Sequence, residues 1–88
     1  MNDIMNVCWI VTDCLHDEVI TVCETKQDAR EEALKFFVGI AEYNNWEEEE
    51  ITGWSNELYN SSSLYDDFGI DDIVYCEKLK FLPNTLAR

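Results

Sequence analysis

Residues 7 to 24 read VCWIVTDCLHDEVITVCE, and their pattern is typical of two β-strands joined by a turn. Two runs rich in β-branched and aromatic residues, Val7–Cys14 and Val19–Glu24, flank the polar segment Leu15–Glu18. This arrangement predicts a β-hairpin with a four-residue connection. Apolar side chains occupy both alternating positions of each run. We therefore expect either strands covered on both faces or one face left for a partner.

The segment after the hairpin has the pattern of an α-helix. Thr25 occupies the position of an N-cap residue, and acids at 28, 31 and 32 suit the positive end of a helix dipole. Apolar residues then follow at helical spacing, namely Ala29, Ala33, Phe36, Phe37, Ile40 and Ala41. We expect a helix from about residue 26 to 43, ended by Asn44 and Asn45.

The periodicity weakens beyond Trp46. Residues 50–55 predict a short strand or turn, and the polar run Asn60–Ser63 predicts a loop after it. Residues 73–82 (IVYCEKLKFL) regain strand character, which Pro83 ends. The resulting order, β-β-α-(β)-β without repeat or linker, predicts one α+β domain over residues 1–88. We expect a small, mainly antiparallel sheet with one helix packed on a face.

Composition narrows the classes of partner. Nineteen Asp and Glu stand against six Lys and Arg, which gives a formal net charge of −13 in 88 residues. Nucleic acid and anionic membranes both attract positive protein surfaces, so neither is expected to bind directly, whereas a basic protein is. Net negative charge also has an ordinary explanation, because it keeps a small domain soluble and monomeric.

The N-terminus and the cysteines indicate a cytoplasmic protein. No segment approaches the roughly 20 apolar residues of a membrane helix. Residues 1–5 (MNDIM) lack the basic region of a secretion signal. We therefore expect Cys8, Cys14, Cys23 and Cys76 to be reduced thiols that serve as small apolar residues.

The sequence contains no clear motif of a catalytic or cofactor-binding site. The one histidine, His16, falls in the predicted turn with no serine near it in sequence, so we do not expect an enzyme. Cys8 and Cys14 would lie about 20 Å apart on one extended strand, too far to share a zinc ion. A calcium loop starting at Asp66 would lack oxygen ligands at its third and fifth positions. The three glycines are isolated, so no phosphate-binding loop is present. No cofactor and no metal is expected.

Acidic residues are concentrated in one half of the chain. Between Lys35 and Lys78 there are eleven acids and no basic residue. Aromatic residues are interleaved with these acids, and aromatic anchors within a charged rim are typical of protein-binding surfaces. The alternative is that Trp46, Trp54 and Phe68 close the core. We expect the partner-binding residues to be Glu47, Glu48, Glu49, Glu50, Trp54, Glu57, Tyr65, Asp66, Asp67, Asp71 and Asp72.

The stretch WEEEEITGW (46–54) followed by LYDDFGIDD (64–72), with the small size and the acidity, resembles small phage-encoded counter-defence proteins of the anti-CRISPR and nucleic-acid-mimic type. The resemblance is one of size and composition and covers the whole chain. It implies an inhibitor or decoy that works in the host cytoplasm. Such a protein would dock on the basic, nucleic-acid-binding surface of a target, for example a bacterial defence nuclease complex.

A second hypothesis comes from the hairpin. Trp9, Ile10, Val11, Ile20 and Val22 make it apolar on both sides, and a homo-oligomeric structural or adaptor module could pair this surface with its own copy. In that case the isolated protein is a homodimer insensitive to salt, whereas the inhibitor hypothesis expects a monomer.

Overall fold

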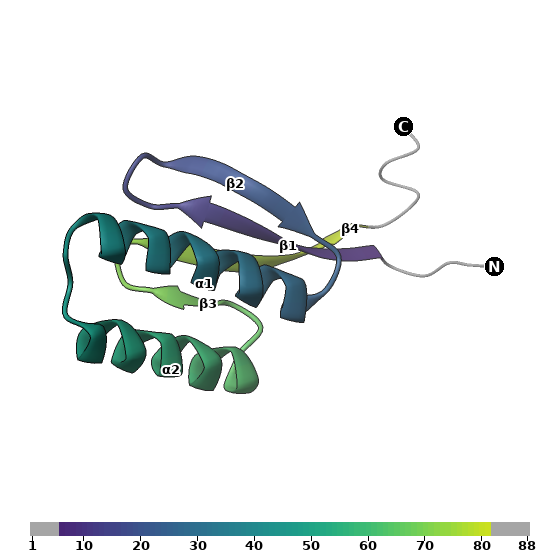
Figure 1. Cartoon of the computed structure of the whole chain (residues 1–88). Coiled ribbons are helices and arrows are strands. Elements are labelled where there is room, and N and C mark those ends of the chain that lie inside the picture. The colour runs from purple at the N-terminus through teal and green to yellow at the C-terminus, as the bar shows by residue number, and fades with distance from the viewer. Residues whose placement is uncertain (1–5, 82–88) are drawn as a thin grey trace.

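The computed structural model describes residues 6–81, which form one antiparallel sheet and two helices (Figure 1). The elements in chain order are β1 (Asn6–Asp13), β2 (Glu18–Cys23), α1 (Lys26–Tyr43), α2 (Glu48–Leu64), β3 (Phe68–Ile70) and β4 (Val74–Phe81). The strand order in the sheet is β2-β1-β4-β3. The α+β class and the antiparallel sheet are confirmed. The expected order is wrong in detail, because two helices rather than one stand between the second and third strands.

The β1–β2 hairpin forms around the side chain of Asp13. Its Oδ1 accepts hydrogen bonds from the backbone N–H groups of Leu15 (2.8 Å) and His16 (3.1 Å), which closes the turn over residues 14–17. Asp17 completes the turn with φ 55°, a left-handed conformation that Asp tolerates better than most residues. The connection has four residues as expected, but it begins one residue earlier.

Helix α1 matches its expected range. The Thr25 Oγ1 accepts a hydrogen bond from the backbone N–H of Asp28 (3.1 Å), and Asn44 and Asn45 follow the last turn. Its buried face consists of Ala29, Ala33, Phe37 and Ala41, all at 0% exposure. Three of these four side chains are methyl groups, so the helix can lie close against the sheet.

Helix α2 replaces the strand or turn expected at 50–55 and the loop expected after it. Ile51, Ser55, Leu58 and Ser62 recur at helical spacing, and Leu58 and Ser62 are fully buried. The Ser55 and Ser62 hydroxyls donate to carbonyl oxygens of their own helix, at Ile51 (2.7 Å) and Tyr59 (2.9 Å). Because both hydroxyls are satisfied within the helix, the buried Ser62 acts as a small core residue, and Ser55 is half-buried. The polar run that indicated a loop is helical.

The sheet ends in a second hairpin, β3–β4, and β3 lies between residues 55 and 73, where no strand was expected. Gly69 of β3 lies so close to β4 that an added Cβ would stand 2.3 Å from the carbonyl oxygen of Val74. Strand β4 matches the expected strand at 73–82 within a residue, and Leu82 and Pro83 lie outside the described residues. Within residues 6–81, neither helix is long and apolar enough to cross a membrane.

The two faces of the sheet differ. Trp9, Val11 and Cys76 point to the helices and are buried, and Phe68 of β3 joins them at 3% exposure. On the opposite face Ile10 is paired across the sheet with Val22 on one side, and Val22 is 57% exposed. Of the two arrangements that the hairpin pattern allowed, the structure therefore has the second, with one face covered by helices and one open.

Candidate functional site

Both hairpin turns and the junction of the two helices meet at one end of the molecule (Figure 1). The turns are joined directly, because the backbone N–H of Cys14 donates to the carbonyl oxygen of Ile73 at 2.9 Å. Helix α1 ends here and α2 begins here, with Trp46 packed edge-on against Phe37 at 5.6 Å between ring centroids. Three separate segments of the chain are thereby held next to one another.

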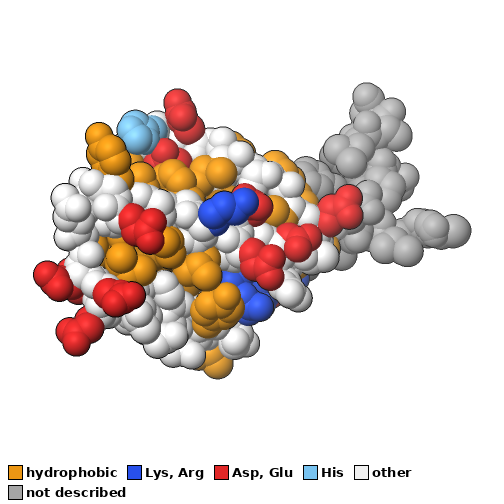
Figure 2. All heavy atoms as spheres, viewed as in Figure 1, with side chains coloured by type: hydrophobic (Ala, Val, Ile, Leu, Met, Phe, Trp, Pro, Cys, Tyr) orange, Lys and Arg blue, Asp and Glu red, His pale blue; other side chains and the backbone are white. Residues whose placement is uncertain are grey.

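These segments carry nine exposed carboxylates, which we call the acidic end: Asp17, Glu18, Glu42, Glu47, Glu48, Glu49, Glu50, Asp71 and Asp72. Among the residues that the structure describes, none of the nine forms an ion pair with a Lys or Arg. Figure 2 shows acidic side chains but no Lys or Arg at this end in the view drawn. The negative charge of the acidic end is therefore not neutralised within the described part of the protein.

The Lys and Arg side chains whose contacts the structure describes lie outside the acidic end. Lys26 and Lys78 contact the segment that joins α2 to β3, and Arg30 stacks on the Tyr59 ring at 4.7 Å. Lys35 lies on an exposed part of α1, 3.6 Å from a carboxylate oxygen of Glu32. Because the positive charges lie elsewhere, the potential at the acidic end is more negative than it would be if the same net charge were spread evenly over the surface.

Some carboxylates of the acidic end have a structural reason for their positions. Glu48, Glu49 and Glu50 lie in the first turn of α2, where negative charge interacts favourably with the helix dipole. Asp72 has φ 60° in the β3–β4 turn, as Asp17 has in the other turn. Glu42 is different, because it lies in the last turn of α1, where the dipole disfavours a negative charge.

Tyr65, Asp66 and Asp67, expected to contact a partner, lie away from the acidic end in the connection from α2 to β3. The Lys78 Nζ donates to Asp66 Oδ2 at 3.2 Å, and Lys26 Nζ lies 3.7 Å from Oδ1. The hydrogen bond from Lys78 and the charges of both lysines lower the pKa of Asp66. Asp67 Oδ1 accepts a hydrogen bond from the backbone N–H of Lys78 (2.9 Å). Both carboxylates are therefore engaged within the protein, whereas Tyr65 is 62% exposed.

Trp54 and Glu57 lie along α2 beyond its first turn. Together with Glu50 and Gly53 they line a shallow hollow of about 310 Å³, and the Trp54 side chain is 39% exposed. An aromatic edge beside two carboxylates can pack on the alkyl part of a lysine or arginine while the acids contact its charge. These two residues therefore extend the acidic end along the helix.

The expected partner-binding residues are thus brought together only in part. Glu47–Glu50, Asp71 and Asp72 lie at the acidic end, and Trp54 and Glu57 adjoin it. Asp17, Glu18 and Glu42 were not among the expected site residues. The polar turn of the predicted hairpin was a signal for Asp17 and Glu18, but their position beside the β3–β4 turn depends on the pairing of β1 with β4.

A cysteine, an aspartate and a histidine lie together in the β1–β2 turn. His16 Nδ1 is 2.7 Å from Asp13 Oδ2, but the thiol of Cys14 donates to the carbonyl oxygen of Thr12 at 3.9 Å. Burial and the neighbouring carboxylates raise the pKa of Cys14. A nucleophilic cysteine requires a lowered pKa, so the local electrostatics oppose thiolate chemistry here.

No group of three or more His, Cys, Asp or Glu side chains within residues 6–81 is arranged to hold a metal ion.

The chain matches no family model, no curated protein and no solved structure.

Proposed function

We propose that the protein is an acidic binding module that docks through its acidic end on a basic surface of a target protein. The supporting observation is the set of nine exposed carboxylates without an ion pair to a described Lys or Arg. A concentrated negative surface on a folded scaffold attracts a cationic one, accelerates its association and repels nucleic acid and anionic membranes.

A nucleic-acid-binding surface is the target chemistry that fits best, such as the groove of a bacterial defence nuclease. Such a groove carries clustered Lys and Arg that normally neutralise phosphates. The acidic end could occupy the groove as a mimic of the nucleic-acid backbone and inhibit the target. Glu42 supports a role beyond folding, because its charge opposes the dipole of its own helix.

The test uses two triple variants that each remove three negative charges. The first neutralises the acidic end with Asp17→Asn, Asp72→Asn and Glu47→Gln. Asn tolerates the left-handed backbone at positions 17 and 72, so both turns are retained. The control variant carries Asp28→Asn, Glu31→Gln and Glu77→Gln, three exposed acids outside the acidic end.

Immobilised wild-type and variant proteins are compared for capture of proteins from a bacterial lysate, and the captured protein is then tested for binding to a labelled oligonucleotide. We expect the wild type and the control variant to capture the same basic protein at about 0.15 M salt and to displace the oligonucleotide. The acidic-end variant should do neither. Equal capture by both triple variants would show that the acidic end is not the docking surface.

The open face of the sheet favours a second candidate, a homo-oligomeric module. Val19, Val22 and Tyr75 on this face are 60%, 57% and 43% exposed, and Ile10 lies between Val22 and Glu77 in the sheet register. Two such faces could pack together. Sedimentation separates the candidates, because a dimer that persists in high salt supports the module, and a monomer supports the inhibitor.

A further inference from the structure

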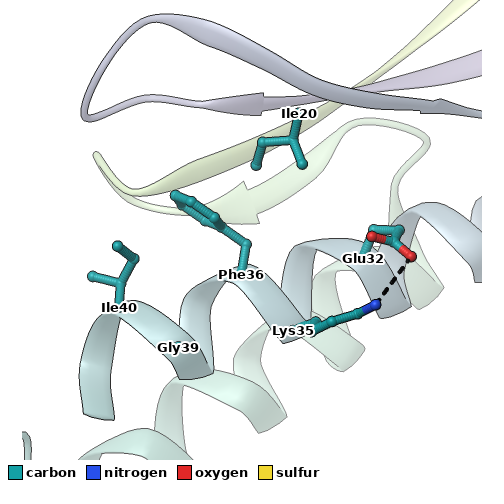
Figure 3. A pocket seen from close by; sticks show the side chains of 6 residues that line it. All are labelled: Ile20, Glu32, Lys35, Phe36, Gly39 and Ile40. Carbon is teal, nitrogen blue, oxygen red and sulfur yellow. Dashed lines mark ion pairs between the residues drawn. The ribbon is translucent and has the colours of Figure 1, made fainter. Parts of the chain in front are cut away.

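A hollow of about 370 Å³ separates α1 from the edge strand β2 (Figure 3). It is lined by Ile20, Glu32, Lys35, Phe36, Gly39 and Ile40, and we call it the α1–β2 groove. Helix α2 packs on the other flank of α1 and contacts β3. The helical layer is therefore one helix short of covering β2.

A β-bulge in the β1–β2 pair shapes the wall of the groove. Val11 pairs with Thr21 but Thr12 pairs with Val19, so Ile20 is the extra residue. Figure 3 shows the Ile20 side chain pointing from the sheet toward α1, where Phe36 points back toward it. A bulge also interrupts the free hydrogen-bonding edge of β2, which disfavours the addition of a further strand. The groove therefore favours a helix as its occupant.

Gly39 forms part of the floor on α1. A Cβ built at this position meets no atom within 4 Å, so the fold of the chain does not require a glycine here. Glycine is nevertheless unfavourable in the interior of a helix. The missing side chain lets the backbone of an occupant approach α1 closely, as small residues do where helices pack tightly.

The charges near the groove and on the whole chain favour a helix with basic residues. Glu32 offsets Lys35 in the groove, and Glu18 and Glu24 flank the two ends of β2. A second copy of this chain would bring a net charge of −13 against −13, which repels. We propose that the α1–β2 groove binds an amphipathic helix of a partner protein, with its apolar stripe on Ile20 and Phe36 and basic residues along its flanks.

This inference goes beyond the proposed function, because none of the six residues that line the groove belongs to the acidic end. A partner could use both surfaces at once, with a basic patch on the acidic end and a basic helix in the groove. The two surfaces can also fail independently in the tests.

The probe is a synthetic helical peptide of roughly 18 leucines and lysines in which leucine recurs every three or four residues. A scrambled peptide of the same composition serves as the control for charge. Binding is measured by fluorescence anisotropy and mapped by NMR amide shifts of the isotope-labelled full chain. We expect the amphipathic peptide alone to shift Ile20, Phe36, Gly39 and Ile40 together. Shifts confined to the acidic end or the open sheet face, equal binding of the scrambled peptide, or no binding would each overturn the proposal.

Two matched variants test the groove itself. Gly39→Leu fills it, whereas Asn60→Leu places the same side chain at an exposed position of α2, outside the groove and the acidic end. Both changes favour the helix, so both proteins should fold. We expect Gly39→Leu to weaken peptide binding by about tenfold or more and Asn60→Leu to leave it unchanged. Equal affinity of the two variants would refute the groove, as would a wild-type dimer that Gly39→Leu disperses, because a second copy would then be the occupant.

The triple variant of the acidic end should still bind the peptide in the groove. Loss of lysate capture with retained peptide binding would therefore support both surfaces separately. If the triple variant of the acidic end still captured its target from the lysate, the acidic end would not be the docking surface. Loss of peptide binding in Gly39→Leu would still support the groove in that case.

Discussion

The Nδ1 atom of His16 lies 2.7 Å from Oδ2 of Asp13, so the single histidine of the chain is held by the carboxylate that also forms the β1–β2 turn. Burial raises the pKa of Asp13, but the hydrogen bonds from the His16 ring and from the backbone of His16 and Leu15 outweigh it, and the pKa is lowered. The hydrogen bond and the charge of Asp13 raise the pKa of His16. Each group therefore stabilises the charged form of the other.

The pair should make stability depend on pH in a defined window. The raised pKa of His16 contributes stability below its ordinary value of 6.5, and that contribution is lost as the pH rises through the folded-state pKa. The lowered pKa of Asp13 contributes above its ordinary value of 3.8, and that contribution is lost as the pH falls. The combined contribution is largest between these two ordinary values.

We therefore expect the wild type to lose more stability than a His16→Asn variant when the pH rises from about 5.5 to about 8.5. Urea unfolding at the two pH values measures the difference, and the variant accounts for the pH response of all other groups. A parallel loss in both proteins would show that the pair does not contribute.

Leu58 should be a main determinant of how α2 docks. It is fully buried, and Leu58→Ala should lower the free energy of unfolding by about 2–5 kcal/mol, because truncation leaves a cavity. Leu64 on the same helix is 73% exposed, so Leu64→Ala should change the free energy by less than about 0.5 kcal/mol. Urea denaturation compares the two, and similar losses would contradict the position of α2.

Lys26 should stabilise the C-terminal end of α2. Its Nζ donates to the carbonyl oxygens of Ser62 (2.8 Å) and Tyr65 (3.0 Å). Lys26→Met should lower the free energy of unfolding by about 1–2 kcal/mol, because these carbonyls lose a charged donor. Lys35→Met removes only an exposed ion pair with Glu32 and should change it by less than about 0.5 kcal/mol. Thermal and urea unfolding measure the stability of both variants. Equal losses of stability would contradict the stabilising role of the hydrogen bonds from Lys26.

The three glycines should respond differently to alanine. At Gly39 and Gly53 a Cβ meets nothing within 4 Å, so alanine should raise the free energy of unfolding by about 0.5–1 kcal/mol. At Gly69 the Cβ would stand 2.3 Å from a backbone oxygen of β4, so alanine should destabilise the sheet. Differential scanning calorimetry gives the order of the three melting temperatures. A stabilised Gly69→Ala would contradict the close pairing of β3 with β4.

The cysteines should differ in reactivity. Burial raises the pKa of Cys76 to about 12, and its thiol donates to the carbonyl oxygen of Ala29 at 3.7 Å. Iodoacetamide at about pH 8 should therefore label exposed Cys14 in the native protein and reach Cys23 and Cys76 only on unfolding. Mass spectrometry of the labelled protein locates the sites. Native labelling of Cys76 as fast as Cys14 would place Cys76 outside the core.

Local signals in the sequence were enough to predict several of the helices and strands. The N-cap Thr25 and the spacing of Ala29, Ala33 and Phe37 predicted α1, and β-branched runs predicted β1, β2 and β4. Helix α2 was missed because Ser55 and Ser62 are polar by composition, yet their hydroxyls bond to carbonyl oxygens one turn earlier and their small size suits a helix interface. That interface exists only once α1 and β3 provide it.

The candidate surfaces depend on tertiary structure. The sequence determined that the chain is strongly acidic and that Glu47–Glu50 form a cluster, because a run of like charges is visible without a fold. It could not show that Asp66 is paired with two lysines, or that the turn with Asp71 and Asp72 is hydrogen-bonded to the turn with Asp17. Only the pairing of β1 with β4 and the reversal between α1 and α2 decide these positions, since electrostatic interactions follow distance in space rather than separation along the chain.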